Sequence, residues 1–206
     1  MSTDFLLEFS SFLLKSNALK FGAFTLSSGK PSPYYIDLRM LPSFPQHFRL
    51  VAGQMSKVAK QMNFDILGSV PTSGLIFGSA LAYEMSRPFV YVRKESKDYG
   101  TGKLVEGHIP SGSRVLIVDD VATTGLSVSK AVEAIRANGG VVDDVLAVVS
   151  RREGAEELLK KMGVNLTAVT TIQDITKTLH QSGLVDDNTL DAVLKQVAGS
   201  GEYEAG

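Results

Sequence analysis

Two adjacent carboxylates, Asp119 and Asp120, lie between a short apolar run and a turn rich in small and hydroxyl residues. The run, residues 115–118, has the Val, Ile and Leu content of a buried strand, and a helical pattern starts after the turn. Backbone N–H groups of such a turn bind phosphate at a helix N-terminus. The carboxylates would repel that phosphate, so they suit a pair of sugar hydroxyls, or Mg²⁺ and its waters. The segment can therefore hold a ribose that carries a 5′-phosphate.

The common nucleotide-binding loops do not fit this segment. It has neither the Gly-Lys-Ser/Thr order of a Walker A loop nor the spaced glycines of dinucleotide binders. Two carboxylates alone would favour an ordinary strand-to-helix turn capped by Asp and Thr. The complete run is more specific, because it resembles the phosphoribosyl pyrophosphate signature of type I phosphoribosyltransferases. The resemblance implies contacts with phosphoribosyl pyrophosphate from Asp119, Asp120, Val121, Ala122, Thr123, Thr124, Gly125, Leu126 and Ser127, with catalytic roles for the two acids.

A second segment, residues 91–102, leaves an apolar run and becomes basic and punctuated by glycine. On its composition alone it would be a solvated, charged hairpin. It nevertheless resembles the catalytic loop of orotate phosphoribosyltransferases. The resemblance implies that Arg93, Lys94 and Lys97 are catalytic and clamp the pyrophosphate, partly from the neighbouring subunit of a homodimer. Tyr99 stands where the family commonly has His; it can donate a hydrogen bond but cannot carry a positive charge.

Two further segments match the same family. Residues 24–37 resemble its base-binding segment, and the alternative is a surface hairpin with two packed tyrosines. Residues 150–154 match the place where the family sets an Arg on the orotate carboxylate, and the alternative is a surface charge. The resemblance implies orotate contacts from Ser27, Lys30, Tyr34, Tyr35, Thr123 and Arg151. Ser27 replaces a Lys of the bacterial members.

A third anion-binding turn is expected at residues 70–74, between a strand and a helix. Its backbone N–H groups, with Thr72 and Ser73, would contact the pyrophosphate. A tight turn with a helix cap explains these residues nearly as well. The family often has a Lys here, so the groups that neutralise the substrate differ in this chain.

Alternating strands and helices must position these segments. Short apolar runs predict strands at residues 65–70, 88–92, 114–118, 141–150 and 166–172, and helical patterns lie at 46–62, 74–85, 126–138 and 154–162. The N-terminus predicts a helix and then two short strands within residues 21–39, and a packing helix follows Asp186. This order predicts an α/β protein with a mostly parallel twisted sheet flanked by helices. The resemblance adds the type I phosphoribosyltransferase fold, with an N-terminal hood and base-binding segment at 1–45, a core at 46–206 and a mobile catalytic loop at 93–112.

The amino-acid composition indicates which classes of partner and which chemistry are not expected. The 21 basic and 22 acidic residues give a net charge of −1, so nucleic acid and anionic membranes are not expected partners. The absence of cysteine excludes disulfides and thiolate chemistry. The first residues do not have the pattern of a signal peptide, and the expected location is the cytoplasm.

The function expected from the resemblance is transfer of the phosphoribosyl group to orotate, with Mg²⁺ as cofactor. The metal would be held mainly by substrate and water, without direct protein ligands. His47, His108 and His180 form no convincing catalytic group, which fits a reaction that needs no strong base. The alternatives are transfer to another base, a regulator that binds phosphoribosyl pyrophosphate without turnover, and a plain nucleotide-binding domain.

Overall fold

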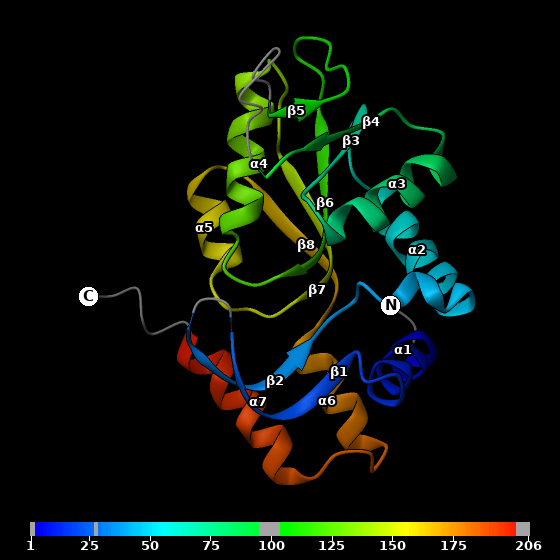
Figure 1. Ribbon diagram of the computed structural model, residues 1–206, viewed down its shortest axis with the longest axis vertical. Helices are drawn as coiled ribbons and strands as arrows, with labels where there is room; N and C mark the ends of the chain where they lie inside the picture. The colour runs from blue at the N-terminus through cyan, green and yellow to red at the C-terminus, as the bar shows by residue number, and fades with distance from the viewer. Residues whose placement is uncertain (1–2, 27–28, 95–103, 201–206) are drawn as a thin grey trace.

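The chain, described here by a computed structural model over residues 3–26, 29–94 and 104–200, has two sheets with helices packed around them (Figure 1). The larger sheet has six strands in the order β5-β4-β3-β6-β7-β8, and its neighbours pair in parallel except β4 with β5. These strands are β3 (Ile66–Ser69), β4 (Phe89–Val92), β5 (Val105–Glu106), β6 (Val115–Ala122), β7 (Asp144–Ser150) and β8 (Asn165–Thr171). The helices are α1 (Thr3–Lys15), α2 (Pro45–Ala59), α3 (Ser73–Met85), α4 (Leu126–Ala137), α5 (Ala155–Lys161), α6 (Ile172–Gln181) and α7 (Asp187–Ser200), with a 3-10 turn at Leu41–Ser43. The predicted fold class is confirmed.

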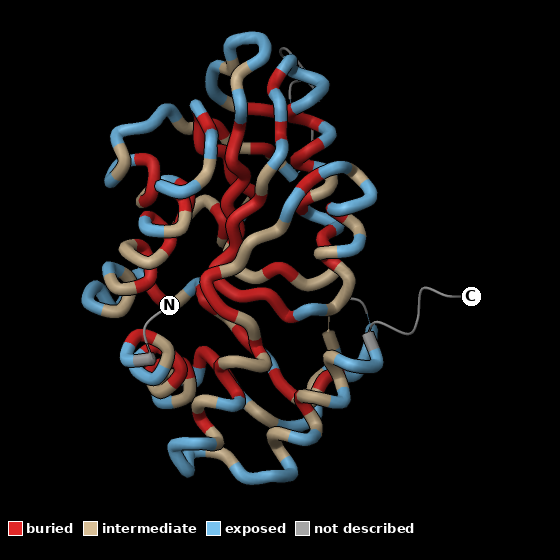
Figure 2. The backbone as a smooth tube through the Cα atoms, turned by 180° about the vertical axis from the view of Figure 1, so that it is seen from behind, coloured by how far each residue is buried: buried red, intermediate tan, exposed pale blue. Residues whose placement is uncertain are grey.

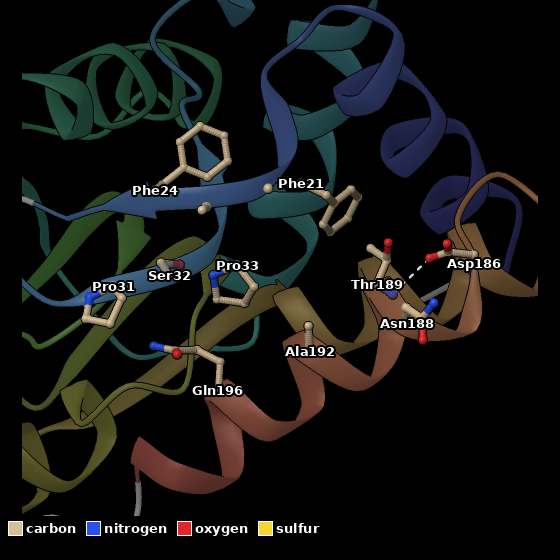
Figure 3. Close-up of a pocket in the computed structure, with 12 residues that line it drawn as sticks. Phe21, Phe24, Pro31, Ser32, Pro33, Asp186, Asn188, Thr189, Ala192 and Gln196 are labelled. Carbon is tan, nitrogen blue, oxygen red and sulfur yellow. Dashed lines mark hydrogen bonds between the residues drawn. The ribbon is translucent and has the colours of Figure 1, made fainter.

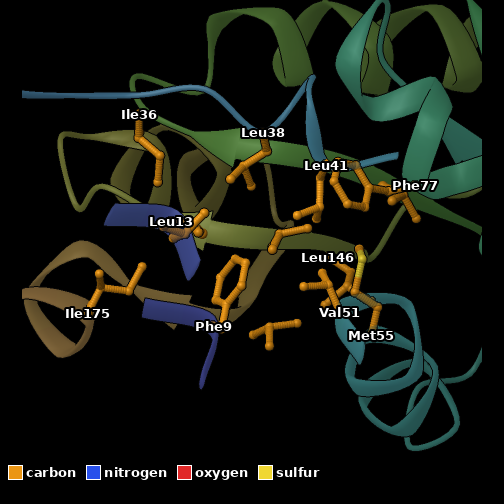
Figure 4. Packing of buried hydrophobic residues seen from close by; sticks show 14 of the residues in the cluster. Phe9, Leu13, Ile36, Leu38, Leu41, Val51, Met55, Phe77, Leu146 and Ile175 are labelled. Atoms are coloured by element: carbon orange, nitrogen blue, oxygen red, sulfur yellow. The ribbon is translucent and has the colours of Figure 1, made fainter. Parts of the chain in front are cut away.

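The central strand β6 divides its side chains between two hydrophobic cores. Leu116 and Val118 belong to the core built with α1, α2, α3 and α6, which Figure 4 shows from close by. Val115 and Ile117 belong to the core built with α4. Successive residues of a strand face opposite sides of the sheet, and helices cover both faces here. This is why residues 115–118 form an uninterrupted apolar run.

The smaller sheet is an antiparallel hairpin of β1 (Leu19–Thr25) and β2 (Pro31–Ile36) at one end of the molecule (Figure 1). Helix α1 packs against α6, and α7 packs against both α6 and β2. Segments from both ends of the chain therefore build the layer that contains the predicted hood. The division of the chain at residue 45 stays a prediction.

Helix α6 differs from the expectation. The sequence predicts a strand as far as residue 172 and no helix directly after it, whereas β8 ends at Thr171 and α6 begins at Ile172. Thr171 is the N-cap, and its hydroxyl accepts a hydrogen bond from the backbone N–H of Asp174 at 3.1 Å. Ile172, Ile175 and Leu179 are fully buried. Packing of this face, rather than helix propensity, stabilises the helix.

Burial follows the same architecture. Figure 2 shows that the buried stretches of backbone run through the large sheet and along the inner faces of the helices. None of the helices in the described part of the chain is long and apolar enough to cross a membrane.

Candidate active site

Three loops leave the carboxyl ends of neighbouring parallel strands and lie side by side. Strand β6 lies between β3 and β7, so the loops that begin at residues 70, 123 and 151 share one edge of the sheet. Each loop leads into a helix, α3, α4 or α5. Hydrogen bonds join two of the loops: the N–H of Arg151 donates to the carbonyl of Ala122, and the N–H of Ala155 donates to the carbonyl of Thr123. Ligands of open parallel sheets bind at such an edge.

The strand that carries Asp119 and Asp120 is longer than predicted. The sequence predicts that the strand ends at residue 118, but β6 continues through both acids to Ala122. The pairs Asp119 with Ala147 and Val121 with Val149 continue the ladder to β7. The carboxylates are therefore held by sheet backbone rather than by a loop. Helix α4 begins at Leu126, the predicted first residue, and ends at Ala137, one residue before the predicted end.

Gly125 shapes the turn that precedes α4. Its φ of 79° lies in the left-handed region that favours glycine, and it is the N-cap residue of the helix. A Cβ at this position would lie 3.1 Å from the Cα of Ala155. The turn therefore packs directly on the start of α5, and the free N–H groups at the start of α4 are available to an anion.

Asp119 carries the unusual electrostatics of the site. Only 9% of the residue is exposed, and its Oδ1 accepts a hydrogen bond from the N–H of Asp120 at 2.9 Å. Burial raises the pKa of the Asp119 carboxyl well above its ordinary value, and the charge of Asp120 raises it further. A group that brings hydroxyl donors or a cation to this carboxylate would relieve both effects.

Gly74, in the first turn of α3, lies directly against this acid. A Cβ there would be 2.8 Å from the carbonyl oxygen of Val118 and 3.1 Å from Oδ1 of Asp119. We expect Gly74→Ala to destabilise the protein by about 1–3 kcal/mol through overpacking. By displacing Asp119 it should also lower kcat/KM by about tenfold or more. Urea unfolding and steady-state kinetics measure the two effects.

The matched control is Gly53→Ala in helix α2. Apart from its chain neighbours and the backbone of its own helix, a Cβ at Gly53 would have no atom within 4 Å, so this change is expected to stabilise the protein by up to about 1 kcal/mol. Equal losses in the two variants would contradict the close packing at Gly74.

A cleft of about 670 Å³ opens between this sheet edge and the hairpin. The hairpin side of the cleft consists of Thr25, Leu26, Tyr35, Ile36 and Arg39. The sheet side consists of Asp119, Val121, Ala122, Thr123, Thr124, Gly125, Leu126, Ser127, Val128 and Arg151. The cleft thus joins the carboxylate of Asp119, the turn at residues 123–127 and the guanidinium of Arg151.

The predicted site residues fall into three groups. Tyr35, Asp119, residues 121–127 and Arg151 line the cleft. The second group does not line the cleft: Asp120, Thr72, Ser73, Arg93 and Lys94 lie at or just after the carboxyl ends of parallel strands at the same sheet edge, Tyr34 is buried, and Lys30 is exposed. Ser27, Lys97, Tyr99 and the central part of the loop 93–112 fall outside the described residues.

Arg151 reaches the cleft from a buried position. Its side chain is 5% exposed and forms an ion pair with Glu153 at 3.0 Å. The alternative prediction, in which Arg151 is a surface charge, is therefore wrong.

Arg93 lies at the base of the predicted basic loop. Its Nη1 donates to Glu106 at 3.2 Å, and its backbone N–H donates to the carbonyl of Leu104 at 2.8 Å. The pairing of β4 with β5 thus holds the first residue of this loop. Lys94, the next residue, is exposed.

Arg39 is a cleft residue that no sequence motif indicated. Its Nε and its backbone N–H donate to Oδ1 of Asp37 at 2.8 and 2.9 Å, and these bonds hold the pKa of Asp37 below its ordinary value. Tyr35, Asp37 and Arg39 alternate along the chain, and this spacing places side chains on one face of an extended segment. That alternation was the available signal.

A second hollow of about 520 Å³ lies between the hairpin and α7 (Figure 3). Its walls are formed by Phe21, Gly22, Ala23, Phe24, Pro31, Ser32, Pro33, Asp186, Asn188, Thr189, Ala192 and Gln196. It shares no lining residue with the cleft at the sheet edge. Asp119 and the turn at residues 123–127 therefore line the first cleft and not the second.

Comparisons with known proteins agree with this geometry. Residues 40–174 match the phosphoribosyl transferase domain family. The chain is 45% identical over 195 residues to the orotate phosphoribosyltransferase of Cenarchaeum symbiosum. The aligned region covers 93% of this chain and 96% of that protein. The orotate phosphoribosyltransferase of Sulfolobus acidocaldarius is 42% identical, covering 88% of this chain and 92% of that protein.

Solved structures show the same relationship. The crystal structure of the orotate phosphoribosyltransferase from Aeropyrum pernix superposes with a TM-score of 0.76 at 40% identity, covering 86% of this chain and 99% of that one. Leishmania donovani UMP synthase gives a TM-score of 0.84 at 34% identity, covering 94% of this chain and 42% of that longer one. By sequence and by fold, this chain belongs to the phosphoribosyltransferase family and, within it, to the orotate phosphoribosyltransferases.

Proposed function

We propose that this chain transfers the 5-phosphoribosyl group from phosphoribosyl pyrophosphate to orotate. The products are orotidine 5′-phosphate and pyrophosphate, a step of de novo pyrimidine (UMP) biosynthesis. The observation that carries the proposal is a single cleft lined by Asp119, the phosphate-binding turn and buried Arg151. Relatives that span nearly the whole chain are orotate phosphoribosyltransferases, which supports orotate as the base.

Each part of the substrates has a matching group. The 5′-phosphate suits the N–H groups and hydroxyls of residues 123–127 at the start of α4. The ribose hydroxyls suit Asp119 and Asp120. The pyrophosphate suits the turn at Thr72 and Ser73 together with the basic residues Arg93, Lys94 and Lys97. The carboxylate of orotate suits Arg151, and its ring suits the hairpin side of the cleft.

The reaction breaks the bond from C1 of the ribose to the pyrophosphate oxygen and forms a bond from C1 to a ring nitrogen of orotate. Positive charge develops on the ribose and negative charge on the departing pyrophosphate. Carboxylates near the sugar and cationic groups near the pyrophosphate stabilise these charges when both are held in place beforehand. The attacking ring nitrogen gives up its proton, which the oxygens of the departing pyrophosphate can accept, so no dedicated strong base is needed and the protein chiefly binds, orients and excludes water.

Mg²⁺ fits this site. The Asp119 carboxyl is buried, and burial and the neighbouring Asp120 raise its pKa, so a cation nearby would be favourable. The proposal keeps Mg²⁺ held mainly by substrate and water, with Asp119 and Asp120 as the protein groups nearest to it. When bound, the ion neutralises charge on the departing pyrophosphate.

The proposal includes a homodimer and a cytoplasmic location. Family resemblance supports a basic loop that acts on the partner's cleft, which would make the dimer the catalytic unit. A substrate with a phosphate and a pyrophosphate does not cross a bilayer unaided, which supports the cytoplasm. The balanced charge of the chain supports small-molecule substrates rather than nucleic acid.

Two alternatives make different predictions. Transfer to another base would keep the acid and the phosphate turn but would not need a carboxylate partner at Arg151. A regulator would bind phosphoribosyl pyrophosphate without turnover, and the basic loop would then have no leaving group to stabilise.

The test is the loss of orotate absorbance when purified protein is mixed with orotate, phosphoribosyl pyrophosphate and Mg²⁺, with uracil and adenine in parallel. We expect turnover of orotate alone, abolished by chelation of Mg²⁺. Turnover of another base instead of orotate would overturn the choice of substrate. Tight binding of phosphoribosyl pyrophosphate without turnover of any base would favour the regulator.

A further inference from the structure

Arg151 and Glu153 form a buried ion pair behind the wall of the cleft, enclosed by Ser32 and Tyr34 of β2. Arg151 donates from Nε and Nη2 to Oε1 of Glu153, at 3.2 and 3.0 Å. Its Nη2 also donates to Oγ of Ser32 at 3.1 Å. The guanidinium carbon lies 4.3 Å from the centre of the Tyr34 ring. The guanidinium is thus held along one edge and across one face.

Tyr34 contacts both members of the ion pair. Its side chain is fully buried, and its hydroxyl donates to the same Oε1 of Glu153 at 2.8 Å. Burial raises the pKa of the Tyr34 hydroxyl, so the phenol stays neutral and remains a donor. One oxygen of Glu153 therefore accepts from Nε, from Nη2 and from the phenol, and this fixes Glu153 as firmly as Arg151.

A count of donors shows which edge of the guanidinium is left for a ligand. Arginine has N–H groups on Nε, Nη1 and Nη2. Nε and Nη2 are engaged by Glu153 and Ser32, whereas Nη1 has no hydrogen-bond partner among the described residues. Arg151 also lines the cleft. The Nη1 edge is therefore the part of this cation that a carboxylate in the cleft can use.

Burying this ion pair has a free-energy cost that a purely structural role does not explain well. Taking two charges out of water costs more than their mutual attraction returns in many proteins, and apolar replacements are often more stable. The side chains of Arg151 and Glu153 are only 5% and 7% exposed. A network of this kind suits the orientation of a binding group, because fixed neighbours remove the freedom of a long side chain before the ligand arrives.

We infer that Glu153 is a positioning residue, which together with Tyr34 holds the guanidinium of Arg151 so that Nη1 meets the carboxylate of the pyrimidine substrate. The inference rests on the proposed function, because it takes orotate as the ligand of Arg151. Neither Glu153 nor Tyr34 lines the cleft. The orotate-binding role predicted for Tyr34 is then exerted through Arg151 rather than by contact.

The experiment compares Glu153→Ala, Glu153→Gln and Glu153→Asp in steady-state kinetics with each substrate varied in turn. Glu153→Ala removes the acceptor, so KM for orotate should rise by about tenfold or more while KM for phosphoribosyl pyrophosphate stays within about twofold. Glu153→Gln keeps the reach and the acceptor oxygen but loses the charge. Glu153→Asp keeps the charge but is one methylene too short.

If position is what matters, Gln should restore KM for orotate to within about threefold of the wild-type value, and Asp should restore less. Tyr34→Phe, which keeps the ring and removes the phenol donor, should raise KM for orotate by a smaller factor than Glu153→Ala. It also serves as the test if Glu153→Ala does not fold. Glu157→Gln, an exposed glutamate on α5, is the matched control and should change neither KM.

The inference would be overturned by an unchanged KM for orotate in Glu153→Ala and Tyr34→Phe. It would equally be overturned if KM for both substrates rose in parallel, or if Asp restored orotate binding better than Gln. Failure of the proposed function has a different readout: the wild-type protein would not turn over orotate, or Arg151→Ala would leave KM for orotate unchanged.

Discussion

Asp119→Asn is expected to lower kcat/KM by about 100-fold or more and, at neutral pH, to raise the thermal midpoint of unfolding. The loss of activity follows from the site, because Asp119 lines the cleft and would accept hydrogen bonds from ribose hydroxyls as a charged group. Hydrogen bonds to charged groups contribute about 1.5–3 kcal/mol each, so losing the charge at two hydroxyls has an effect of this size.

The gain in stability follows from the raised pKa of the buried Asp119 carboxyl. An unfolded chain releases this proton near the ordinary pKa of Asp, about 3.9, whereas the folded protein keeps it until a higher pH. The folded state therefore binds more protons in that window, and its stability falls as pH rises through it. Asn removes this loss, so the advantage of the variant should vanish below about pH 4 and should grow as pH rises above it.

Calorimetry or circular dichroism between pH 4 and pH 8 measures the stability, and each kcal/mol corresponds to about 2–4 °C in the midpoint for a chain of this size. Asp191→Asn, at an exposed position of α7, is the control and should change neither activity nor midpoint. A variant that is less stable than the wild-type protein at neutral pH would contradict the burial argument.

Arg151→Ala is expected to lower kcat/KM for orotate by about 100-fold or more, with KM for phosphoribosyl pyrophosphate nearly unchanged. The variant removes the guanidinium from the cleft wall and leaves Glu153 buried without its cation. Removing one partner of a buried pair costs about 3–5 kcal/mol, so a lower thermal midpoint is expected as well.

Arg151→Lys tests whether the positive charge alone is sufficient or whether the planar guanidinium is needed. An ammonium cannot bond Glu153, Ser32 and a ligand through one rigid plane, so it should recover only part of the lost activity. The control is Arg152→Ala, the exposed neighbour, which should behave as the wild-type protein does in both assays. Losses of similar size at positions 151 and 152 would show that the segment matters only as a whole and would contradict the role of Arg151.

The class of fold could be predicted from the sequence because its causes are local. Strands buried on both faces form short continuous apolar runs, and the helices between them have their own period and caps. The acid pair, the turn and the start of α4 are adjacent in the chain, so residues 119–127 could be assigned together. In contrast, α6 was missed because Ile and Thr at residues 171–178 favour a strand locally, while the helix depends on packing against α1.

The site itself needed the tertiary structure wherever its parts are distant in sequence. The hydroxyl of Tyr34 meets Glu153 across 119 positions of the chain, and Ser32 meets Arg151 across the same separation. No local period or motif encodes such contacts, because they depend on how the hairpin folds over the sheet edge.

The sequence by itself determined the candidate residues for the chemistry: the acids of β6, the turn at residues 123–127 and the cation at Arg151. Their order along the chain is sufficient for that once it is matched to the family pattern, because each small motif consists of neighbouring residues. Only the tertiary structure decided that Asp119 is buried, that Arg39 joins the cleft and that Arg151 is oriented by Glu153 and Tyr34. Burial and orientation are properties of packed surfaces from different segments, so they arise only when the hairpin and the sheet edge come together.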